Sequence, residues 1–515
     1  MRKHSIALLG IILLGFALRL FILSQRGSLW FDEAFSVHFA SMDLREIWSF
    51  LKFENNPPLY FYVLHFWMLV FGNSETTTRL LSMIFGLASI PMVYVLGAKI
   101  HSRAAGYFAA FLTAISTFQA FYSTETRMYA MYLFFTLTAV WVFLVNQESR
   151  IMNHGLGRRQ SQFKSIIPYS LFIILSLLIW THITAWWFVL VFGVYILWKE
   201  KFNLKQFIIH NSSFIILGAL LVLQFLPWAA NFIRFKIAAP LSQGYFFYLP
   251  PDRNYFLDIL ETFLVFGEDS AFVVTILSGV IIFLLWQALK VRGSGVKLLL
   301  TWLAIPLLVG FAFSNAVPRY FIAVAPALYL LMGVGFARYR EAQPPKPRRL
   351  SFLFPIIMFA LVLPDYASLA KIAHHRWDEL TDWIVTHESR EMKQESCLTP
   401  RVSCLILINP HSEVLPFERY YRGVLPVIGF YPREDSDSRD LRVVKTNWVS
   451  INTKENVRAL ADVTEGYNRV FLVTGEIDQT IGRNLVPIWF WENGWIRASS
   501  KEFGRLGVMG LVRVP

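Results

Sequence analysis

Two adjacent carboxylates, Asp32 and Glu33, follow directly after the first long apolar stretch of the chain. A charge beside hydrocarbon costs several kcal/mol unless it is paired, hydrated or used in chemistry. The preceding Trp30 and Phe31 favour the membrane–water interface and would anchor the pair at that depth, in an acidic loop. Because consecutive residues do not share a helix face, we expect separate jobs, one carboxylate as a general base and the other positioning a partner or a cation. The plainer alternative is a solvated pair that caps the helix after it.

Two arginines are candidates for binding an anion. Arg127 and Arg319 each stand near the predicted outer end of an apolar segment. The planar guanidinium group matches a phosphate through two parallel hydrogen bonds, so both residues suit a phosphate ligand. Arg127 lies close to Glu125, and Arg319 is followed by Tyr320. A snorkelling side chain, an ion pair with Glu125 or an interfacial anchor would explain these residues without a ligand.

Three further polar residues could touch a substrate. His182 stands in the short turn between two apolar segments, where it could bind a metal ion or a polar head group. Asn56 precedes Pro57 and Pro58, where it could hydrogen-bond a sugar or cap the next helix, and Tyr60 follows. A single histidine at a turn is more often structural. No set of side chains has a recognisable metal-binding spacing, so a divalent metal ion is left unassigned.

The elements that position these residues are predicted to be membrane-spanning helices. Of the 515 residues, 55% are hydrophobic and only 16% are charged, against about 25% charged in soluble domains. A twelfth apolar run, residues 57–72, is short and begins with two prolines, so we expect it to lie partly in the membrane. Eleven other segments are apolar enough to span a bilayer: residues 5–24, 79–98, 105–122, 128–146, 166–181, 183–198, 207–227, 271–289, 298–314, 319–337 and 350–366.

The distribution of charge predicts how these helices are oriented. Residues 1–366 hold 29 Lys and Arg against 16 Asp and Glu, whereas residues 367–515 hold 19 of each. The net charge of +13 therefore belongs to the membrane part, where topology explains it better than nucleic-acid binding does. Basic residues gather in alternate loops, which places the N-terminus inside by the positive-inside rule. Most acidic residues of this part fall on the outer side, where we expect the working face.

The last part of the chain has a different composition and predicts a second domain. Residues 367–515 contain no apolar span, so we divide the chain into a membrane domain, residues 1–366, and an outer soluble α/β domain, residues 367–515. Cys397 and Cys404 are the only cysteines, and they predict either a disulfide in an oxidising compartment or two unpaired thiols. Periodicity predicts helices over residues 375–387 and 455–463 and strands over residues 404–408 and 469–473.

Four short motifs, in order along the chain, resemble those of one enzyme superfamily. They are Trp30–Ala34, Asn56–Tyr60 with Gly72 and Arg79 behind it, Glu125–Ala130 and Pro318–Tyr320. The pattern covers about residues 25–340 and resembles the GT-C membrane glycosyltransferases. The nearest group is the protein-O-mannosyltransferase-like superfamily, which includes the bacterial lipid A aminoarabinose transferases. Asn56 departs from the aminoarabinose enzymes, in which a lysine commonly precedes the double proline, so the sugar stays open.

The resemblance implies an inverting transfer of a sugar from a polyprenyl phosphate to an acceptor hydroxyl at the non-cytoplasmic face of the membrane. Asp32 would take the acceptor proton with the support of Glu33. Arg127, Arg319 and Tyr320 would bind the donor phosphate, while the remaining candidates, Asn56, Tyr60, Glu125 and His182, would contact substrate.

The resemblance leaves several features of the reaction open. Some members of this superfamily also hold a metal near the site. The acceptor could be a protein, a lipid or a glycan. The expected location is a bacterial inner membrane with the site facing the periplasm. The alternative function is a transporter or lipid flippase without transferase activity.

Overall fold

The computed structural model divides the chain into two compact units, and the division does not follow chain order. One unit comprises Met1–Gln25, Leu44–Phe232 and Tyr248–Lys371. The other includes Arg26–Asp43 together with Ile372–Pro515. The structure describes residues 2–51, 56–155, 166–233, 255–266, 271–313, 317–344, 351, 353–372, 375–393, 404–409, 414–429, 460–475, 485–504 and 506–514.

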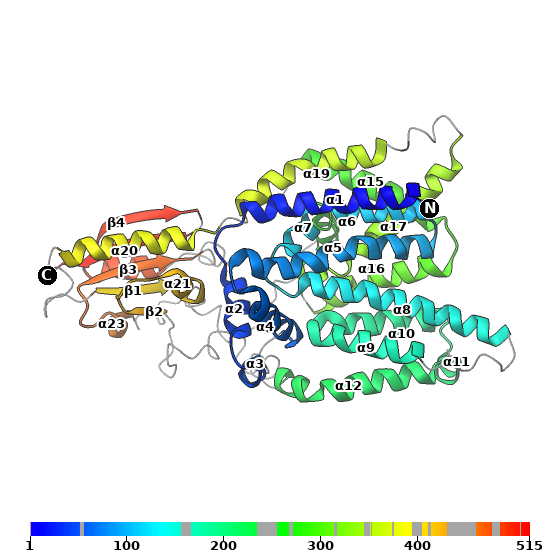
Figure 1. The fold of residues 1–515 in the computed structure, drawn as a ribbon, viewed down its shortest axis with the longest axis horizontal. Coiled ribbons are helices and arrows are strands. Elements are labelled where there is room, and N and C mark those ends of the chain that lie inside the picture. Colours follow the sequence, from blue (N-terminus) through cyan, green and yellow to red (C-terminus); the bar gives the residue numbers. More distant parts are fainter. Residues whose placement is uncertain are drawn as a thin grey trace. The chain divides into compact units, whose positions relative to one another are not determined.

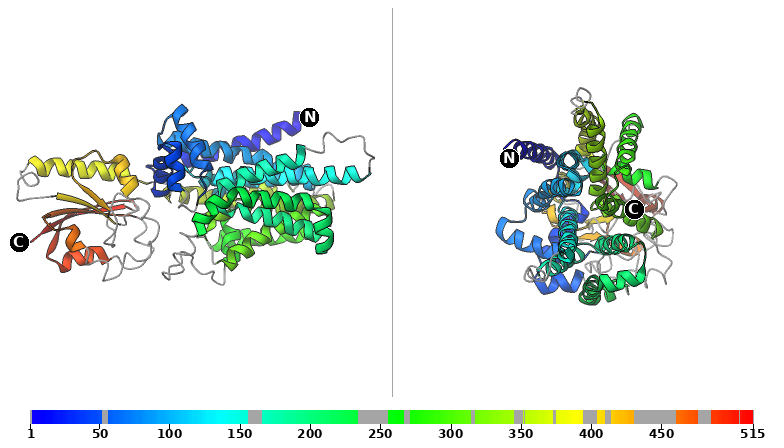
Figure 2. Two further views of the ribbon diagram at one scale, coloured as in Figure 1. Left: turned by 90° about the horizontal axis from the view of Figure 1, so that it is seen from below. Right: turned by 90° about the vertical axis from the view of Figure 1, so that its right-hand side faces the viewer.

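The first unit is a bundle of helices that run alongside one another, as the end-on view in Figure 2 shows. Its helices are α1 (Arg2–Gln25), α3 (Leu44–Leu51), α4 (Leu59–Phe71), α5 (Glu75–Ile100), α6 (Arg103–Ile115), α7 (Thr117–Ser123), α8 (Tyr129–Gly155), α9 (Ile166–Thr181), η1 (Ile183–Ala185), α10 (Trp186–Lys199), α11 (Leu204–His210), α12 (Ser212–Phe232), α14 (Tyr255–Thr262), α15 (Ala271–Leu289), α16 (Ser294–Ala312), η3 (Pro318–Phe321), α17 (Ala325–Ala342) and α19 (Leu353–Ile372) (Figure 1).

Helical residues occupy all eleven apolar segments that the sequence predicts, and the short run at residues 57–72 forms α4. Within the described residues, six helices are long and apolar enough to cross a membrane, or eight if each of two bent helix pairs is one span. One bent pair is α6 and α7, which meet at an angle of 60°. The prediction of a polytopic helical membrane protein is confirmed, and the count of eleven spans stays a prediction.

Close backbone approaches hold the centre of this bundle together. A Cβ atom added to Gly106 in α6 would lie 2.5 Å from the Tyr94 carbonyl oxygen in α5. One added to Gly333 in α17 would lie 2.5 Å from the Ala105 carbonyl oxygen in α6. Small residues let helices pack at such distances inside a membrane, where lipid is as apolar as the side chains. These three helices therefore form a tightly packed core.

The second unit combines α2 (Phe31–Ala40) with a mixed α/β region. Five strands lie in the order β2-β1-β3-β5-β4, with β1 parallel to β2 and β3, and β5 antiparallel to β3 and β4. The elements of this region are α20 (Trp377–Lys393), β1 (Cys404–Asn409), α21 (Val414–Tyr420), β2 (Val427–Gly429), α23 (Leu460–Val463), β3 (Arg469–Thr474), α24 (Leu485–Glu492), β4 (Trp495–Phe503) and β5 (Leu506–Arg513).

Alternate residues of the central strands build a core on each face of this sheet. Ile406 and Ile408 of β1 pack in one apolar cluster with Trp377 of α20. Leu405 and Leu407 pack in the other cluster, which also contains Phe490 of α24. This alternation follows from the two-residue period of a strand. It makes α20 and α24 the helical covers of opposite faces.

The two strands predicted in this region are confirmed as β1 and β3, and the first predicted helix is α20. The predicted helix at residues 455–463 is described only from residue 460, as α23. Cys404 is disulfide-bonded at the start of β1, while Cys397 lies outside the described residues. The sheet also contains β2 and the β4–β5 hairpin, which the sequence patterns did not predict.

Candidate active site

Asp32 and Glu33 lie in the first turn of α2, so the predicted acidic loop is the start of a helix. Trp30 precedes the helix in an extended conformation. Glu33 is fully buried, whereas Asp32 is only partly covered. The two carboxylates thus have different environments, as the helical geometry requires.

The residues just before α2 are held by the C-terminal part of the same unit. The Ser28 N–H donates to the His375 carbonyl at 2.9 Å, and the Ser28 hydroxyl donates to Asp378 Oδ1 at 2.6 Å. The Leu29 N–H donates to the Tyr420 hydroxyl at 2.8 Å. These three bonds join segments about 350 to 390 residues apart in the sequence. They fix the backbone from which Asp32 projects.

Close packing around His375 reinforces these hydrogen bonds. The rings of Trp30 and His375 are stacked, with centroids 6.3 Å apart and an interplanar angle of 13°. A Cβ atom at Gly27 would lie 2.0 Å from the His375 carbonyl oxygen. Only glycine therefore fits at position 27. The start of α2 is bound on both sides of Ser28 to the segment that leads into α20.

In the helical unit, His182 lies in the turn between α9 and η1, outside the candidate spans, and is fully buried. Its Nδ1 accepts a hydrogen bond from the Thr184 backbone N–H at 3.3 Å and lies 2.7 Å from the Thr184 hydroxyl. The ring stacks on Tyr132 with centroids 4.9 Å apart. A backbone amide can only donate, so Nδ1 is an acceptor and the neutral ring carries its proton on Nε2. Among the described residues, Nε2 has no hydrogen-bond partner.

The environment of His182 is positively charged. Burial, and then the charges of Arg127 and Arg319, lower the pKa of His182 to about 3. The His182 and Tyr320 rings lie 5.5 Å apart, and the Arg319 guanidinium lies 5.9 Å from the Tyr320 ring. The Arg127 guanidinium lies 5.9 Å from the Tyr129 ring, which is 5.8 Å from His182. The structure thus brings Arg127, His182, Arg319 and Tyr320 together around one buried point.

Glu125 and Tyr60 are linked to the backbone of Arg127, Glu125 directly and Tyr60 through Ser82. Glu125 is fully buried, and its carbonyl accepts the Arg127 N–H at 2.7 Å in a tight turn. The Ser82 hydroxyl donates to the Arg127 carbonyl at 3.0 Å and lies 3.1 Å from the Tyr60 hydroxyl. Asn56 is buried just before α4, whose N-cap residue is Pro58, so Asn56 is not the cap of that helix. Of these residues, Tyr60 acts through the backbone that presents Arg127.

Two functional neighbours escaped the sequence analysis. Tyr132 and Thr184 both contact the His182 ring. The Thr184 hydroxyl donates to the Tyr132 hydroxyl at 3.0 Å. Tyr132 lies one helical turn after Met128, within the motif-bearing start of α8. Its position one turn after the Glu125–Ala130 motif was the available signal. Thr184, two residues after His182, is typical of a residue that fixes a histidine tautomer.

Asp365 is another buried carboxylate that the sequence analysis passed over. It is fully buried in α19, where it accepts the Phe266 N–H at 2.7 Å and a hydrogen bond from the Thr117 hydroxyl. An acidic residue within an apolar segment is itself a signal of a specific role. Here the partners belong to α7 and to the segment that follows α14, so Asp365 ties both of them to α19.

Within the part of the chain that the structure describes, no three His, Cys, Asp or Glu side chains gather as a metal site. Glu54, His374 and residues 234–254 of the long loop at residues 228–269 lie outside the described residues.

Comparison with known proteins shows a family match within the helical part. Residues 55–228 match the family described as dolichyl-phosphate-mannose-protein mannosyltransferase. This segment contains Asn56, Arg127 and His182. No curated protein sequence matches the chain significantly.

Solved structures of similar fold extend over nearly the whole chain. ArnT from Cupriavidus metallidurans in the apo state has a TM-score of 0.60 and 13% sequence identity, over 98% of this chain and 97% of that chain. The same protein bound to undecaprenyl phosphate has a TM-score of 0.53 and 14% identity, over 98% and 97%. The archaeal oligosaccharyltransferase AglB from Archaeoglobus fulgidus, in complex with an inhibitory peptide and a dolichol-phosphate, has a TM-score of 0.54 and 14% identity, over 98% and 74%.

These findings confirm the recognition that the four motifs suggested. The described helices, the mixed sheet and the similarity over nearly the full length give this chain an ArnT-like fold. Residues 55–228 match the dolichyl-phosphate-mannose-protein mannosyltransferase family, and this match supports the resemblance of the chain to the GT-C membrane glycosyltransferases.

Proposed function

We propose that this protein moves a sugar from a polyprenyl phosphate to an acceptor hydroxyl, with inversion at the anomeric carbon. The observation that carries the proposal is the cluster of buried Arg127 and His182 with half-buried Arg319. Two guanidinium groups and an Nε2–H donor are the groups that a departing phosphate needs.

On the acceptor side, Asp32 takes the proton of the attacking hydroxyl. The acceptor oxygen forms a bond to the anomeric carbon while the bond from that carbon to the phosphate oxygen breaks. The electron pair leaves with the phosphate, which stays on the polyprenyl lipid. Asp32 suits the base because it is a partly covered carboxylate at a helix N-terminus, while the buried Glu33 supports the turn.

On the donor side, Arg127 and Arg319 hold the phosphate, and Tyr320 packs against His182 to orient the ring. Because Nδ1 accepts the Thr184 amide, neutral His182 can donate only from Nε2. Two similar structures hold a polyprenyl phosphate, undecaprenyl phosphate in ArnT and dolichol-phosphate in AglB. A long-chain lipid phosphate is therefore the donor class that we assign here.

Several features of the protein belong to the same proposal. We place eleven spans in the membrane with the N-terminus inside, and the active site on the non-cytoplasmic face of a bacterial inner membrane. We keep a membrane domain over residues 1–366 and an outer domain over residues 367–515, with Arg26–Asp43 of the former belonging to the compact unit of the latter. Asn56 contacts the sugar or phosphate. The acceptor is a protein, lipid or glycan hydroxyl. An AglB structure contains Zn and sulfate, but no step here is assigned to a metal.

The test is the release of radiolabelled sugar from a panel of polyprenyl-phosphate sugars by purified protein in lipid. Wild type should release sugar from one donor, and the panel then names that donor. Asp32→Asn should reduce turnover by about 10²- to 10⁴-fold, the usual contribution of a general base, while binding of the donor changes little. Equal sugar release by wild type and a folded Asp32→Asn protein would contradict the role of Asp32. Sugar-lipid movement across the bilayer without release would favour a transporter.

A further inference from the structure

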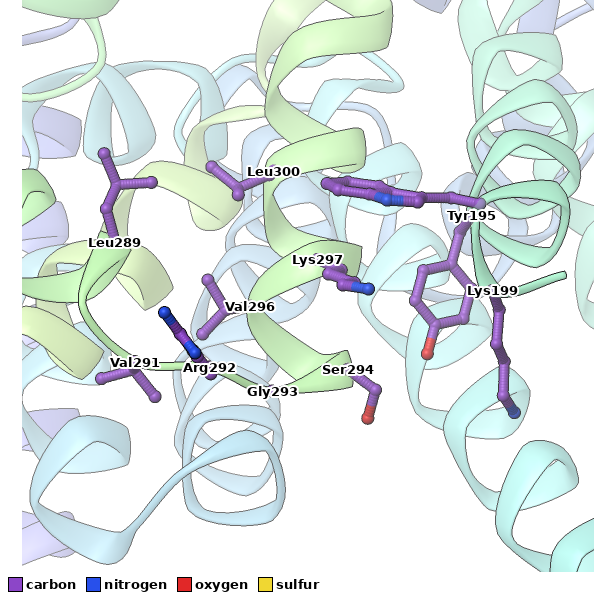
Figure 3. Close-up of a pocket in the computed structure, with 11 residues that line it drawn as sticks. Tyr195, Lys199, Leu289, Val291, Arg292, Gly293, Ser294, Val296, Lys297 and Leu300 are labelled. Atoms are coloured by element: carbon purple, nitrogen blue, oxygen red, sulfur yellow. The ribbon is translucent and has the colours of Figure 1, made fainter. Parts of the chain in front are cut away.

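A second concave site lies at the far end of α10 from His182. Its volume is about 510 Å³, and it is lined by the end of α10, the end of α15 and the start of α16 (Figure 3). Residues Trp186–Lys199 of α10 separate the two sites. At 1.5 Å per residue, this helix alone spans roughly 20 Å. The cavity is therefore not part of the proposed donor site.

The cavity collects positive charge that no carboxylate balances. Lys199, Arg292 and Lys297 line it, and Figure 3 shows them spaced around its walls. Among the described residues, none of the three has an ion-pair partner. Lys199 instead donates to Gln147 at 3.2 Å, and the Lys297 ammonium lies 5.3 Å from the Trp198 ring. Three unbalanced cations around one hollow favour an anionic ligand.

Unlike the basic residues of the cavity, another lysine at this end of the bundle is paired with a carboxylate. The Lys99 ammonium at the end of α5 forms an ion pair with Glu148 of α8 at 2.6 Å. Glu148 adjoins Gln147, the partner of Lys199, so both lysines belong to the same end of the unit. A carboxylate is thus available to a basic residue at this depth, yet the cavity has none.

The remaining walls of the cavity are apolar and lie at membrane-boundary depth. Leu289, Val291, Val296 and Leu300 supply most of them. Leu289 is the last residue of one candidate span, and the next candidate span begins at Ser294. A small soluble anion does not need an apolar wall, whereas a phospholipid presents a phosphodiester next to its acyl chains. Basic pockets between helices at this depth are typical binding sites for lipid head groups.

We propose that this cavity binds the phosphodiester head group of an anionic glycerophospholipid. Lys199, Arg292 and Lys297 contact the phosphate, and the leucine and valine side chains contact the first part of the acyl chains. The lipid would join α10, α15 and α16 where they leave the membrane. This binding site does not depend on the proposed transferase reaction.

Native mass spectrometry of the full-length protein with added phosphatidylglycerol or phosphatidylcholine tests the site. The test variant is the double substitution Arg292→Gln and Lys297→Gln. Its control is Lys201→Gln and Lys205→Gln, which removes the same charge from two exposed residues near α11 that do not line the cavity. Wild type and control should retain phosphatidylglycerol in preference to phosphatidylcholine. The test variant should bind phosphatidylglycerol at least tenfold more weakly.

Two results would overturn the proposal. An equal loss of phosphatidylglycerol from both double variants would mean that the lipid responds to overall charge and not to this cavity. Competition by millimolar inorganic phosphate that removes the bound lipid would assign the site to a soluble anion. Neither readout uses catalytic activity, so a failed transferase assay leaves the result interpretable.

Discussion

At the scale of single residues, His182 connects the chemistry of the site to its stability. Its Nδ1 is occupied by the Thr184 amide, and its Nε2–H is the remaining donor beside Arg127 and Arg319. The ring must stay neutral to serve in this way while the site holds no anion, because a third positive charge would be buried with the two arginines. The same positively charged environment that favours a phosphate therefore disfavours protonation of His182.

The lowered pKa of His182 predicts that the stability of the folded protein depends on pH. The pKa of His182 is about 3 in the folded protein and about 6.5 in an unfolded chain. Between these values the unfolded chain binds the proton and the folded protein does not, so stability is full above about pH 6.5 and falls as the pH is lowered. The loss from one group is at most about 1.4 kcal/mol per pH unit. Thermal unfolding at pH 7.5 and pH 5 should show a smaller difference for His182→Gln than for wild type.

The expected loss of stability at low pH comes from this one residue. The substitution removes one titrating group and keeps a polar side chain of similar length. A pH dependence that is the same in His182→Gln and wild type would show that His182 does not titrate as the buried geometry requires.

At the scale of elements, the position of α2 depends on residues near the other end of the chain. The Leu29 N–H donates to the Tyr420 hydroxyl of α21 at 2.8 Å. Tyr420→Phe removes this acceptor and leaves a half-buried amide without it, which costs about 1–3 kcal/mol. We expect the turnover number to fall about tenfold while the Michaelis constant for the donor stays within a factor of two, because the start of α2 carries Asp32 and not the phosphate cluster.

The chain offers a matched control for this variant. The Tyr421 hydroxyl also accepts a backbone N–H, from Leu425 at 3.0 Å, within the same unit. Tyr421→Phe should therefore reduce stability by a similar amount and leave the turnover number unchanged. Equal effects of both substitutions on turnover would mean that Tyr420 acts through overall stability and does not position Asp32.

Helix packing in the first unit predicts a pair of glycine variants with opposite outcomes. A Cβ atom at Gly106 would lie 2.5 Å from the Tyr94 carbonyl oxygen, whereas one at Gly218 in α12 would meet nothing within 4 Å. Overpacking of this kind typically costs 1–3 kcal/mol. Gly106→Ala should lower the midpoint of thermal unfolding in detergent, and Gly218→Ala should leave it unchanged or raise it. Equal midpoints for the two variants would contradict the tight packing of α5 on α6.

At the scale of the whole molecule, chain order and spatial organisation differ. Arg26–Asp43 leaves the helical unit after α1, packs with the residues that follow Ile372, and returns to the helical unit at α3. The C-terminal region is therefore more than an appended outer domain, because it holds the segment with Asp32 and Glu33. This arrangement assigns a positioning role to a region that carries no recognisable motif of its own.

Hydrophobicity alone determined where the helices of this protein lie, because a bilayer accepts only long apolar segments with internally satisfied backbones. The runs at residues 79–98 and 271–289, for example, form α5 and α15. The four motifs determined the enzyme class for a related reason, since they combine rare charges with apolar segments. The sequence could not reveal β4, in which most residues between Trp495 and Phe503 are exposed and no apolar alternation marks a buried face.

Only the tertiary structure decided which distant residues act together. Tyr60 is predicted to contact substrate, and the structure places its hydroxyl 3.1 Å from the Ser82 hydroxyl, which donates to the Arg127 carbonyl. Nothing local to Leu29 points to Tyr420, which is 391 residues away. Such pairings arise from the packing of whole helices and strands, and local patterns carry no information about them. The sequence therefore named the chemical groups, and folding selected the neighbours that orient them.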